Sequence, residues 1–391
     1  MTQTYSRTRR ELVPILGLYV VLALLYSLGA PLWEAPDEPS HYLCIRRFAD
    51  GKHFVYPQIA GPPDEAWSRR GIWSLYQRSQ PPLYHLLAAP FMKVIAVRRL
   101  PFGPHLRYPD VRPPPRHQGN LLQHERRGLA AIQPHEVRGH LLRLTGLIPG
   151  ALAVAAVYWM GRRLFKSAAW PVAAAGFAAT LPQYTFITGT INNDGLATLL
   201  ASLALLVLLG LQRQKARPTP RNFLGAGVLL LLGVSTKLSL LFLFPLAWIV
   251  IGLRARAARS PRLALAGIGL SILPSLIVTG TAIALAPAAW AKRGELLWLR
   301  LTHVRTTHLS LAYLWERTGS LYRSFWADFG WMLISVDAWM HWLWGIVLLV
   351  AVAGWVRPHP GKRLDAAMRM SAGILVVALV LLLLAAYKNC L

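Results

Sequence analysis

Long apolar segments alternate with short polar connections along most of the chain. Each apolar segment has about 15 to 25 residues, and a transmembrane helix needs about 20 residues to cross the hydrocarbon core. The pattern therefore predicts an all-α polytopic membrane protein with about nine transmembrane helices. The two consecutive segments before and after Lys237 are shorter than the others. The predicted spans cover residues 11–32, 140–160, 168–185, 195–211, 223–234, 238–253, 263–285, 339–356 and 371–386.

Arginine and lysine gather in the N-terminal tail and in every second connection between the predicted spans. Short basic connections lie in the cytoplasm under the positive-inside rule. The N-terminus is therefore predicted to be cytoplasmic, and the segment after the first span extracytoplasmic. The first apolar run is long and no small-residue cleavage site follows it, so we expect a retained span and not a removed signal peptide.

Two polar segments are longer than simple connections, and both are predicted to be extracytoplasmic. Within the first, residues 83–100 place apolar side chains at helical spacing, which fits either an interfacial helix or a short core helix. The second is rich in tryptophan, which is typical of the headgroup level. The predicted regions are the tail and first span (1–33), the first loop domain (34–139), a transmembrane bundle (140–285), a second loop (286–337) and C-terminal spans (338–391).

Composition and charge support a membrane protein. The chain has 391 residues, is 54% hydrophobic and carries a formal charge of +26, with only 16 acidic residues. A nucleic-acid domain would collect its basic residues on one folded face, whereas here they separate apolar runs. We therefore expect no nucleic-acid partner. Cys44 and Cys390 are the only cysteines, too few for a disulfide framework and without the spacing of a zinc site.

Asp37 and Glu38 lie side by side a few residues after the first span, with His41 following. The C-terminal end of a helix is the negative end of its dipole, so a cation must compensate these carboxylates. Pro39 and Gly51 favour a helix over residues 38–49, which would place both carboxylates within one turn of His41. The pair is a candidate for catalysis. The alternative is that Asp37 caps this helix.

Asn193 and Asp194 follow the third predicted span in an Asn-Asn-Asp-Gly turn. They are either a helix cap or a polar group that faces the first loop. Lys237 follows an apolar segment of roughly 14 residues, or about 21 Å of helix, which is shorter than the hydrocarbon core. Lys237 is therefore predicted to lie below the headgroups and to contact a lipid phosphate or a carboxylate, or to extend its side chain to the interface.

These segments together resemble the GT-C superfamily of membrane glycosyltransferases. More narrowly, the chain is similar to bacterial multispan proteins with a Pro-Asp-Glu-Pro-x-His motif in the first outer loop, related to protein mannosyltransferases and the lipid A aminoarabinose transferase. The residues that carry the resemblance are Ala35 to His41, Gln80 to Tyr84, Asn192 to Gly195 and Thr236–Lys237, with a weaker extension from Ser324 to Trp331.

The resemblance implies a GT-C-like bundle that transfers a sugar, with inversion, from a polyprenyl-phosphate donor to an acceptor at the extracytoplasmic face of the cell membrane. It implies Asp37 as the catalytic base and Glu38 as a second acidic group. It also implies a donor phosphate compensated by Lys237, by an outer-loop arginine, or by Mg²⁺ or Mn²⁺ held by Asp37, Glu38 and His41. The implied substrate-binding residues are His41, Tyr84, Asn193, Asp194, Lys237 and Trp326.

Relatives commonly have more spans and a soluble domain, so we expect either a truncated gene product or an acceptor site formed by the membrane-facing loops. The main alternative function is a lipid or polysaccharide transporter, or flippase. Such a protein would have charged groups in mid-span and two similar halves. Only Lys237 approaches the membrane interior by this reading, and no internal repeat is evident. An inactive membrane scaffold is a third interpretation.

Overall fold

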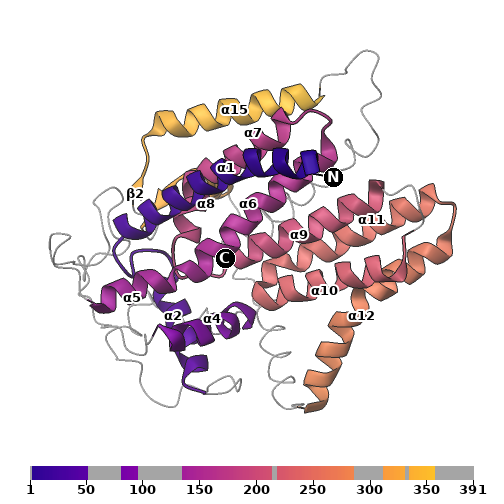
Figure 1. Ribbon diagram of the computed structural model, residues 1–391, viewed down its shortest axis with the longest axis horizontal. Helices are drawn as coiled ribbons and strands as arrows, with labels where there is room; N and C mark the ends of the chain where they lie inside the picture. Colours follow the sequence, from indigo (N-terminus) through magenta and orange to yellow (C-terminus); the bar gives the residue numbers. More distant parts are fainter. Residues whose placement is uncertain are drawn as a thin grey trace. The chain divides into compact units, whose positions relative to one another are not determined.

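The fold is all-α apart from one short hairpin, as the apolar pattern predicts (Figure 1). The computed structural model describes residues 2–51, 81–95, 134–213, 218–285, 311–330 and 334–356. Five helical stretches among them are long and apolar enough to cross a membrane, and a shorter apolar helix spans Ala338–Gly354. The five are Arg10–Gly29, Glu136–Leu164, Asp194–Gln212, Leu238–Ala257 and Pro261–Thr281.

The chain divides into two compact units, which are described separately. The first contains residues 1–53, 63–199 and 318–362. Its elements are α1 (Thr2–Gly29), α2 (Glu38–Ala49), α4 (Leu83–Val94), α5 (Pro134–Leu142), α6 (Leu144–Leu164), α7 (Ala169–Thr180), α8 (Pro182–Thr188), the start of α9 (Asp194–Arg213), most of α14 (Leu311–Trp326), the antiparallel pair β1 (Asp328–Phe329) and β2 (Ile334–Ser335), and α15 (Ala338–Val356).

In the first unit, α1 packs along α6, α7 and α8 (Figure 1). The buried Tyr19 of α1 donates a hydrogen bond to Thr188 Oγ1 of α8 at 2.7 Å. Gly146 of α6 allows a close approach to the segment after α8, because a Cβ there would lie 2.7 Å from the carbonyl oxygen of Thr190. This packing brings the C-terminal end of α1 beside the connection between α8 and α9.

Helices α2 and α4 pack on each other beyond the end of α1. Trp33, Tyr42, Tyr84 and Met92 belong to their shared hydrophobic core. The opposite face of α4 exposes apolar side chains, including Leu87. One face of α4 is thus part of a hydrophobic core, as expected of a core helix. Its other face exposes apolar side chains, as expected of an interfacial helix. Residues 96–100 of the predicted segment lie outside the described residues.

The second unit contains residues 54–62, 200–317 and 363–391. Here α10 (Pro220–Thr236) and α11 (Leu243–Ala257) both pack on α12 (Pro261–Leu285). Helix α10 ends before Lys237, which has an extended backbone, and the chain continues through the 3₁₀ helix η3 (Leu238–Phe242). The predicted interruption at Lys237 is therefore present.

One predicted span is divided. The segment predicted over residues 168–185 forms α7 and α8, which are separated at Leu181. Pro182 explains the break, because it lacks an N–H and disfavours helical backbone in the preceding residue. The predicted span over residues 371–386 and most of the first loop domain lie outside the described residues.

Candidate functional site

The turn between α1 and α2 has a strained backbone. Trp33 and Asp37 both adopt left-handed conformations, with φ of 76° and 62°. Such conformations cost about 1 to 3 kcal/mol each and persist only where the surroundings impose them. The cost is lowest for short polar residues such as aspartate. The turn is therefore held in place by contacts from other elements.

A buried ion pair supplies these contacts. Arg143, at the α5–α6 junction, donates from Nε to Glu38 Oε1 at 2.7 Å and from Nη2 to Glu38 Oε2 at 2.8 Å. Both side chains are almost completely buried, with exposures of 1% and 0%. The Glu38 carboxylate also accepts the backbone N–H groups of Trp33, at 2.9 Å, and Ile191, at 3.1 Å. Glu38 thus joins the α1–α2 turn, α6 and the segment before α9.

Arg143 also neutralises the end of α1. Its guanidinium donates to the carbonyl oxygens of Ser27, Ala30 and Pro31. These carbonyls carry the negative end of the helix dipole. Sequence reasoning required a cation at this position but did not identify Arg143.

The side chain of Asp37 makes no capping hydrogen bond to α2, although Asp37 occupies the N-cap position. Its carbonyl oxygen accepts the N–H of His41 at 3.0 Å, as helix geometry requires. The side chain is half-buried, whereas its neighbour Glu38 is fully enclosed. The alternative in which the Asp37 carboxylate caps the helix is therefore not what the structure shows. The two carboxylates are in different environments.

His41 contacts a second histidine that sequence reasoning did not select. His41 Nδ1 lies 2.9 Å from His85 Nε2, and the two buried rings stack with centroids 5.2 Å apart. Burial lowers the pKa of His85 to about 4, so His85 is neutral at pH 7. Tyr84 lies edge-on to His41, and its hydroxyl is 2.9 Å from Thr145 Oγ1. Burial raises the pKa of Tyr84, which keeps its hydroxyl protonated.

The Asn-Asn-Asp turn lies beside this cluster. Ile191 contacts Glu38 through its backbone N–H, and Asn192 Oδ1 accepts the N–H of Asp194 at 2.8 Å. Asn193 is buried, and Asp194 is the first residue of α9. The structure thus brings the turn that contains Asn193 and Asp194 to the loop that contains Asp37.

Two predicted site residues lie in other surroundings. Trp326 is buried in an aromatic cluster at the α14–α15 contact, where it stacks on Trp344 with centroids 5.5 Å apart. Among the residues that the structure describes, its indole nitrogen has no hydrogen-bond partner. Lys237 belongs to the second unit and is half-buried at the break after α10. The substrate-binding roles of both residues stay predictions.

The predicted metal set of Asp37, Glu38 and His41 fits the geometry poorly. Both oxygens of Glu38 accept hydrogen bonds from Arg143, whose fixed positive charge would repel a cation. His41 faces His85. Within the described ranges, no three His, Cys, Asp or Glu side chains come together in a metal-binding arrangement. We therefore derive no chemical step through a metal at this position.

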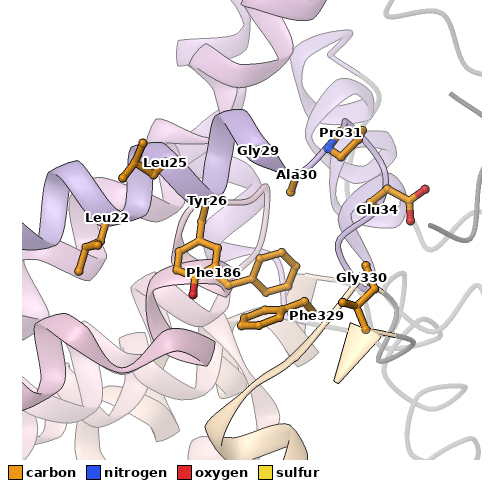
Figure 2. A pocket seen from close by; sticks show the side chains of 11 residues that line it. Leu22, Leu25, Tyr26, Gly29, Ala30, Pro31, Glu34, Phe186, Phe329 and Gly330 are labelled. Atoms are coloured by element: carbon orange, nitrogen blue, oxygen red, sulfur yellow. The ribbon is translucent and has the colours of Figure 1, made fainter. Parts of the chain in front are cut away.

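A cavity of about 420 Å³ lies at the end of α1. Figure 2 shows the aromatic side chains of Tyr26, Phe186 and Phe329 close together, with Leu22 and Leu25 on one side of them and Glu34 on the other. Their ring centroids are 5.2 to 6.1 Å apart. Glu34 is buried in the same turn as Asp37. One residue that lines the cavity, Glu34, therefore belongs to the same turn as the candidate base Asp37.

The sequence contained signals for the residues that were missed. Arg143 lies at the start of a long apolar run, and a charge within such a run usually has a paired role. Glu34, three residues before Asp37, is a further buried carboxylate. His85 directly follows the Pro-Pro-Leu-Tyr segment that carried part of the resemblance.

Comparisons with known proteins locate the likeness in the middle of the chain. Residues 133–279 match the family described as dolichyl-phosphate-mannose-protein mannosyltransferase. This range contains Arg143, Asn193, Asp194 and Lys237 but not Asp37. No curated protein matches the chain significantly.

Among solved structures, the chain is similar to the crystal structure of the Archaeoglobus fulgidus oligosaccharyltransferase complex with Zn and sulfate. The TM-score is 0.40 and the sequence identity 13%, over 96% of this chain and 49% of that chain. The chain thus spans about half the length of that protein. The family match over residues 133–279 agrees with the predicted relation to the GT-C superfamily, whereas the narrower bacterial group stays a prediction.

Proposed function

We propose that this chain is a GT-C-type membrane glycosyltransferase that moves a sugar from a polyprenyl-phosphate donor to an acceptor hydroxyl at the extracytoplasmic face. The match of residues 133–279 to a mannosyltransferase family supports glycosyl transfer. The observation that carries the site assignment is the half-buried Asp37 carboxylate, held beside the end of α1 by a strained turn that does not use it as a cap.

In the proposed reaction, the Asp37 carboxylate takes the proton from the acceptor hydroxyl as its oxygen attacks the anomeric carbon. The bond between that carbon and the phosphate oxygen breaks, and the phosphate leaves on the opposite face with the bonding electrons. The new bond therefore has inverted configuration. The departing phosphate needs a positive charge nearby more than it needs a proton.

The other predicted site residues take supporting roles in this proposal. Glu38 and Arg143 hold the turn that presents Asp37, because their ion pair connects this turn to α6. His41, Tyr84, Asn193 and Asp194 are proposed to contact the sugar or the acceptor. The ring of Trp326 is packed against other aromatic side chains. A substrate contact of this residue would therefore come from its indole N–H, which has no partner among the described residues.

The test is transfer by the Asp37→Asn variant in lipid nanodiscs, with a panel of radiolabelled polyprenyl-phosphate hexoses as donors. We expect turnover to fall by about 10²-fold or more, since positioned general bases contribute on that scale. The matched control is Asp50→Asn, at the other end of α2, where the carboxylate makes only a partly exposed pair with Arg46. Unchanged turnover of Asp37→Asn would exclude the proposed base.

A further inference from the structure

The cavity at the end of α1 reaches from the candidate site into the depth of a membrane span. Pro31 and Glu34 line it beyond the end of the helix, and Leu22 and Leu25 line it within the span Arg10–Gly29. Leu22 lies about two turns before Gly29, which corresponds to roughly 10 Å along the helix axis. The cavity therefore follows about two turns of a helix that is long and apolar enough to cross a membrane.

The lining is suited to a chain that enters from the bilayer. Leu25 is 62% exposed on a helix that is apolar enough to span the membrane, so its side chain faces lipid. The inner wall is formed by the mutually contacting rings of Tyr26, Phe186 and Phe329. The volume of about 420 Å³ is within the range of small-molecule sites.

The charge of the lining residues indicates which substrate, donor or acceptor, the cavity can bind. Among the described lining residues, Glu34 is the acidic one, and no Lys or Arg lines the cavity. A donor phosphate placed here would lie near Glu34, with no lysine or arginine among the described lining residues. An acceptor hydroxyl has no such penalty and can donate a hydrogen bond to a carboxylate. The cavity therefore suits the acceptor better than the donor.

The end of the cavity that Ala30 and Pro31 line is connected to the proposed base through Arg143. The carbonyl oxygens of Ala30 and Pro31, which both line it, accept hydrogen bonds from Arg143 at 2.7 and 3.0 Å. The same guanidinium binds Glu38, the residue next to Asp37. A ligand seated against Ala30 and Pro31 is thus placed by the same contacts that place Asp37.

We infer that this cavity binds an aliphatic chain of the acceptor, and that the acceptor is a membrane lipid with an uncharged, hydroxyl-bearing head group. The inference rests on the proposed function and specifies its acceptor. The chain lies between Leu22, Leu25 and the aromatic wall, and the hydroxyl lies at the Glu34 end. There its proton passes to Asp37 as its oxygen bonds to the anomeric carbon and the donor phosphate departs.

The test uses diacylglycerol, an uncharged lipid with a free hydroxyl, that carries a diazirine in one acyl chain and is incorporated into nanodiscs with the full-length protein. After irradiation, mass spectrometry maps the labelled residues. We expect labelling at residues 22–34 and at Phe186. Absence of labelling there would overturn the inference. So would labelling there by a diazirine-bearing polyprenyl phosphate that diacylglycerol does not displace, because the donor would then be the occupant.

Two pairs of variants connect labelling to the cavity. Gly29 and Gly17 both lie on α1, and a Cβ at either meets no atom within 4 Å, but only Gly29 lines the cavity. Gly29→Leu is expected to reduce labelling about tenfold by occupying apolar space, whereas Gly17→Leu leaves it unchanged. Leu25→Trp and its control Leu28→Trp form a second pair for the same contrast in labelling, since both leucines are exposed and only Leu25 lines the cavity.

Equal labelling of Gly29→Leu and Gly17→Leu would contradict the inference. Failure of the proposed function has a different signature. In that case the cavity is still labelled and Gly29→Leu still reduces the labelling, but no polyprenyl-phosphate hexose gives a labelled lipid product.

Discussion

At the residue scale, neighbouring carboxylates have different surroundings. Glu38 is enclosed and shares its oxygens with Arg143 and two backbone N–H groups, whereas the Asp37 side chain is half-buried and does not cap its helix. The sequence identified the acidic pair and its need for a cation. It did not identify the cation, because Arg143 is 105 positions away and reaches Glu38 only after α6 packs beside α1.

The Glu38–Arg143 pair is predicted to be a stability determinant. Glu38→Gln leaves Arg143 buried with an uncompensated charge, and loss of one partner of a buried pair costs about 3 to 5 kcal/mol. We expect a clearly lower melting temperature in detergent, measured by fluorescence-detected size exclusion. The control is Arg46→Gln, which removes a partly exposed pair with Asp50 that contributes about 0 to 1 kcal/mol. Equal melting temperatures for the two variants would contradict the assigned role of Glu38.

At the element scale, the helices followed from the apolar periodicity, and their packing contacts did not. Residues 195–211 and 263–285 were predicted as spans and correspond closely to α9 and α12. The break between α7 and α8 was missed because Pro182 lies inside a continuous apolar run. The packing of α2 on α4 was also not predicted, since hydropathy does not indicate which helix covers which.

The contact between α2 and α4 gives a pH prediction. Burial holds the pKa of His85 at about 4 in the folded protein, below the ordinary histidine value of 6.5 that applies to the unfolded chain. The unfolded chain therefore binds more protons between these two pH values, and stability rises with pH across them. This histidine's contribution to stability is complete above about pH 6.5 and is lost progressively as the pH falls towards 4. We expect the melting temperature of His85→Phe to depend less on pH than that of the wild type over this window. Identical pH profiles would refute the buried, neutral assignment.

Close helix packing gives a second prediction at this scale. A Cβ at Gly146 would approach the carbonyl oxygens of Thr190 and Thr188 to 2.7 and 2.8 Å, so α6 must move away from the segment that contacts Glu38. We expect Gly146→Ala to lower both the melting temperature and transfer activity. Gly176→Ala on α7 is the control, because a Cβ there meets no atom within 4 Å. A fully active, equally stable Gly146→Ala variant would show that this close approach is not needed.

At the scale of the whole molecule, the alternation of basic and non-basic connections predicts that the turn with Asp37 is extracytoplasmic. The all-α polytopic fold is confirmed by the described helices, and the family match over residues 133–279 agrees with the predicted GT-C relation. The predicted metal set of Asp37, Glu38 and His41 stays a prediction, and the sequence motif did not reveal that Glu38 is bound by Arg143 from another part of the chain.

Topology can be tested with an impermeant maleimide on intact cells, in a variant whose Cys44 and Cys390 are replaced by serine. We expect Asp50→Cys, at the exposed end of α2, to be labelled. Arg163→Cys, at the opposite end of the α6 span, should be labelled only after the cells are permeabilised. The reverse pattern would place the candidate site in the cytoplasm.

The most direct measurement of the central claim is a cryo-electron microscopy structure of the protein with a non-transferable polyprenyl-phosphate sugar. The account predicts that the Asp37 carboxylate faces the anomeric carbon from the side opposite the phosphate, with space for one acceptor oxygen between them. A donor bound with its anomeric carbon remote from Asp37, or with this carboxylate turned away from it, would contradict the assignment of Asp37 as the base.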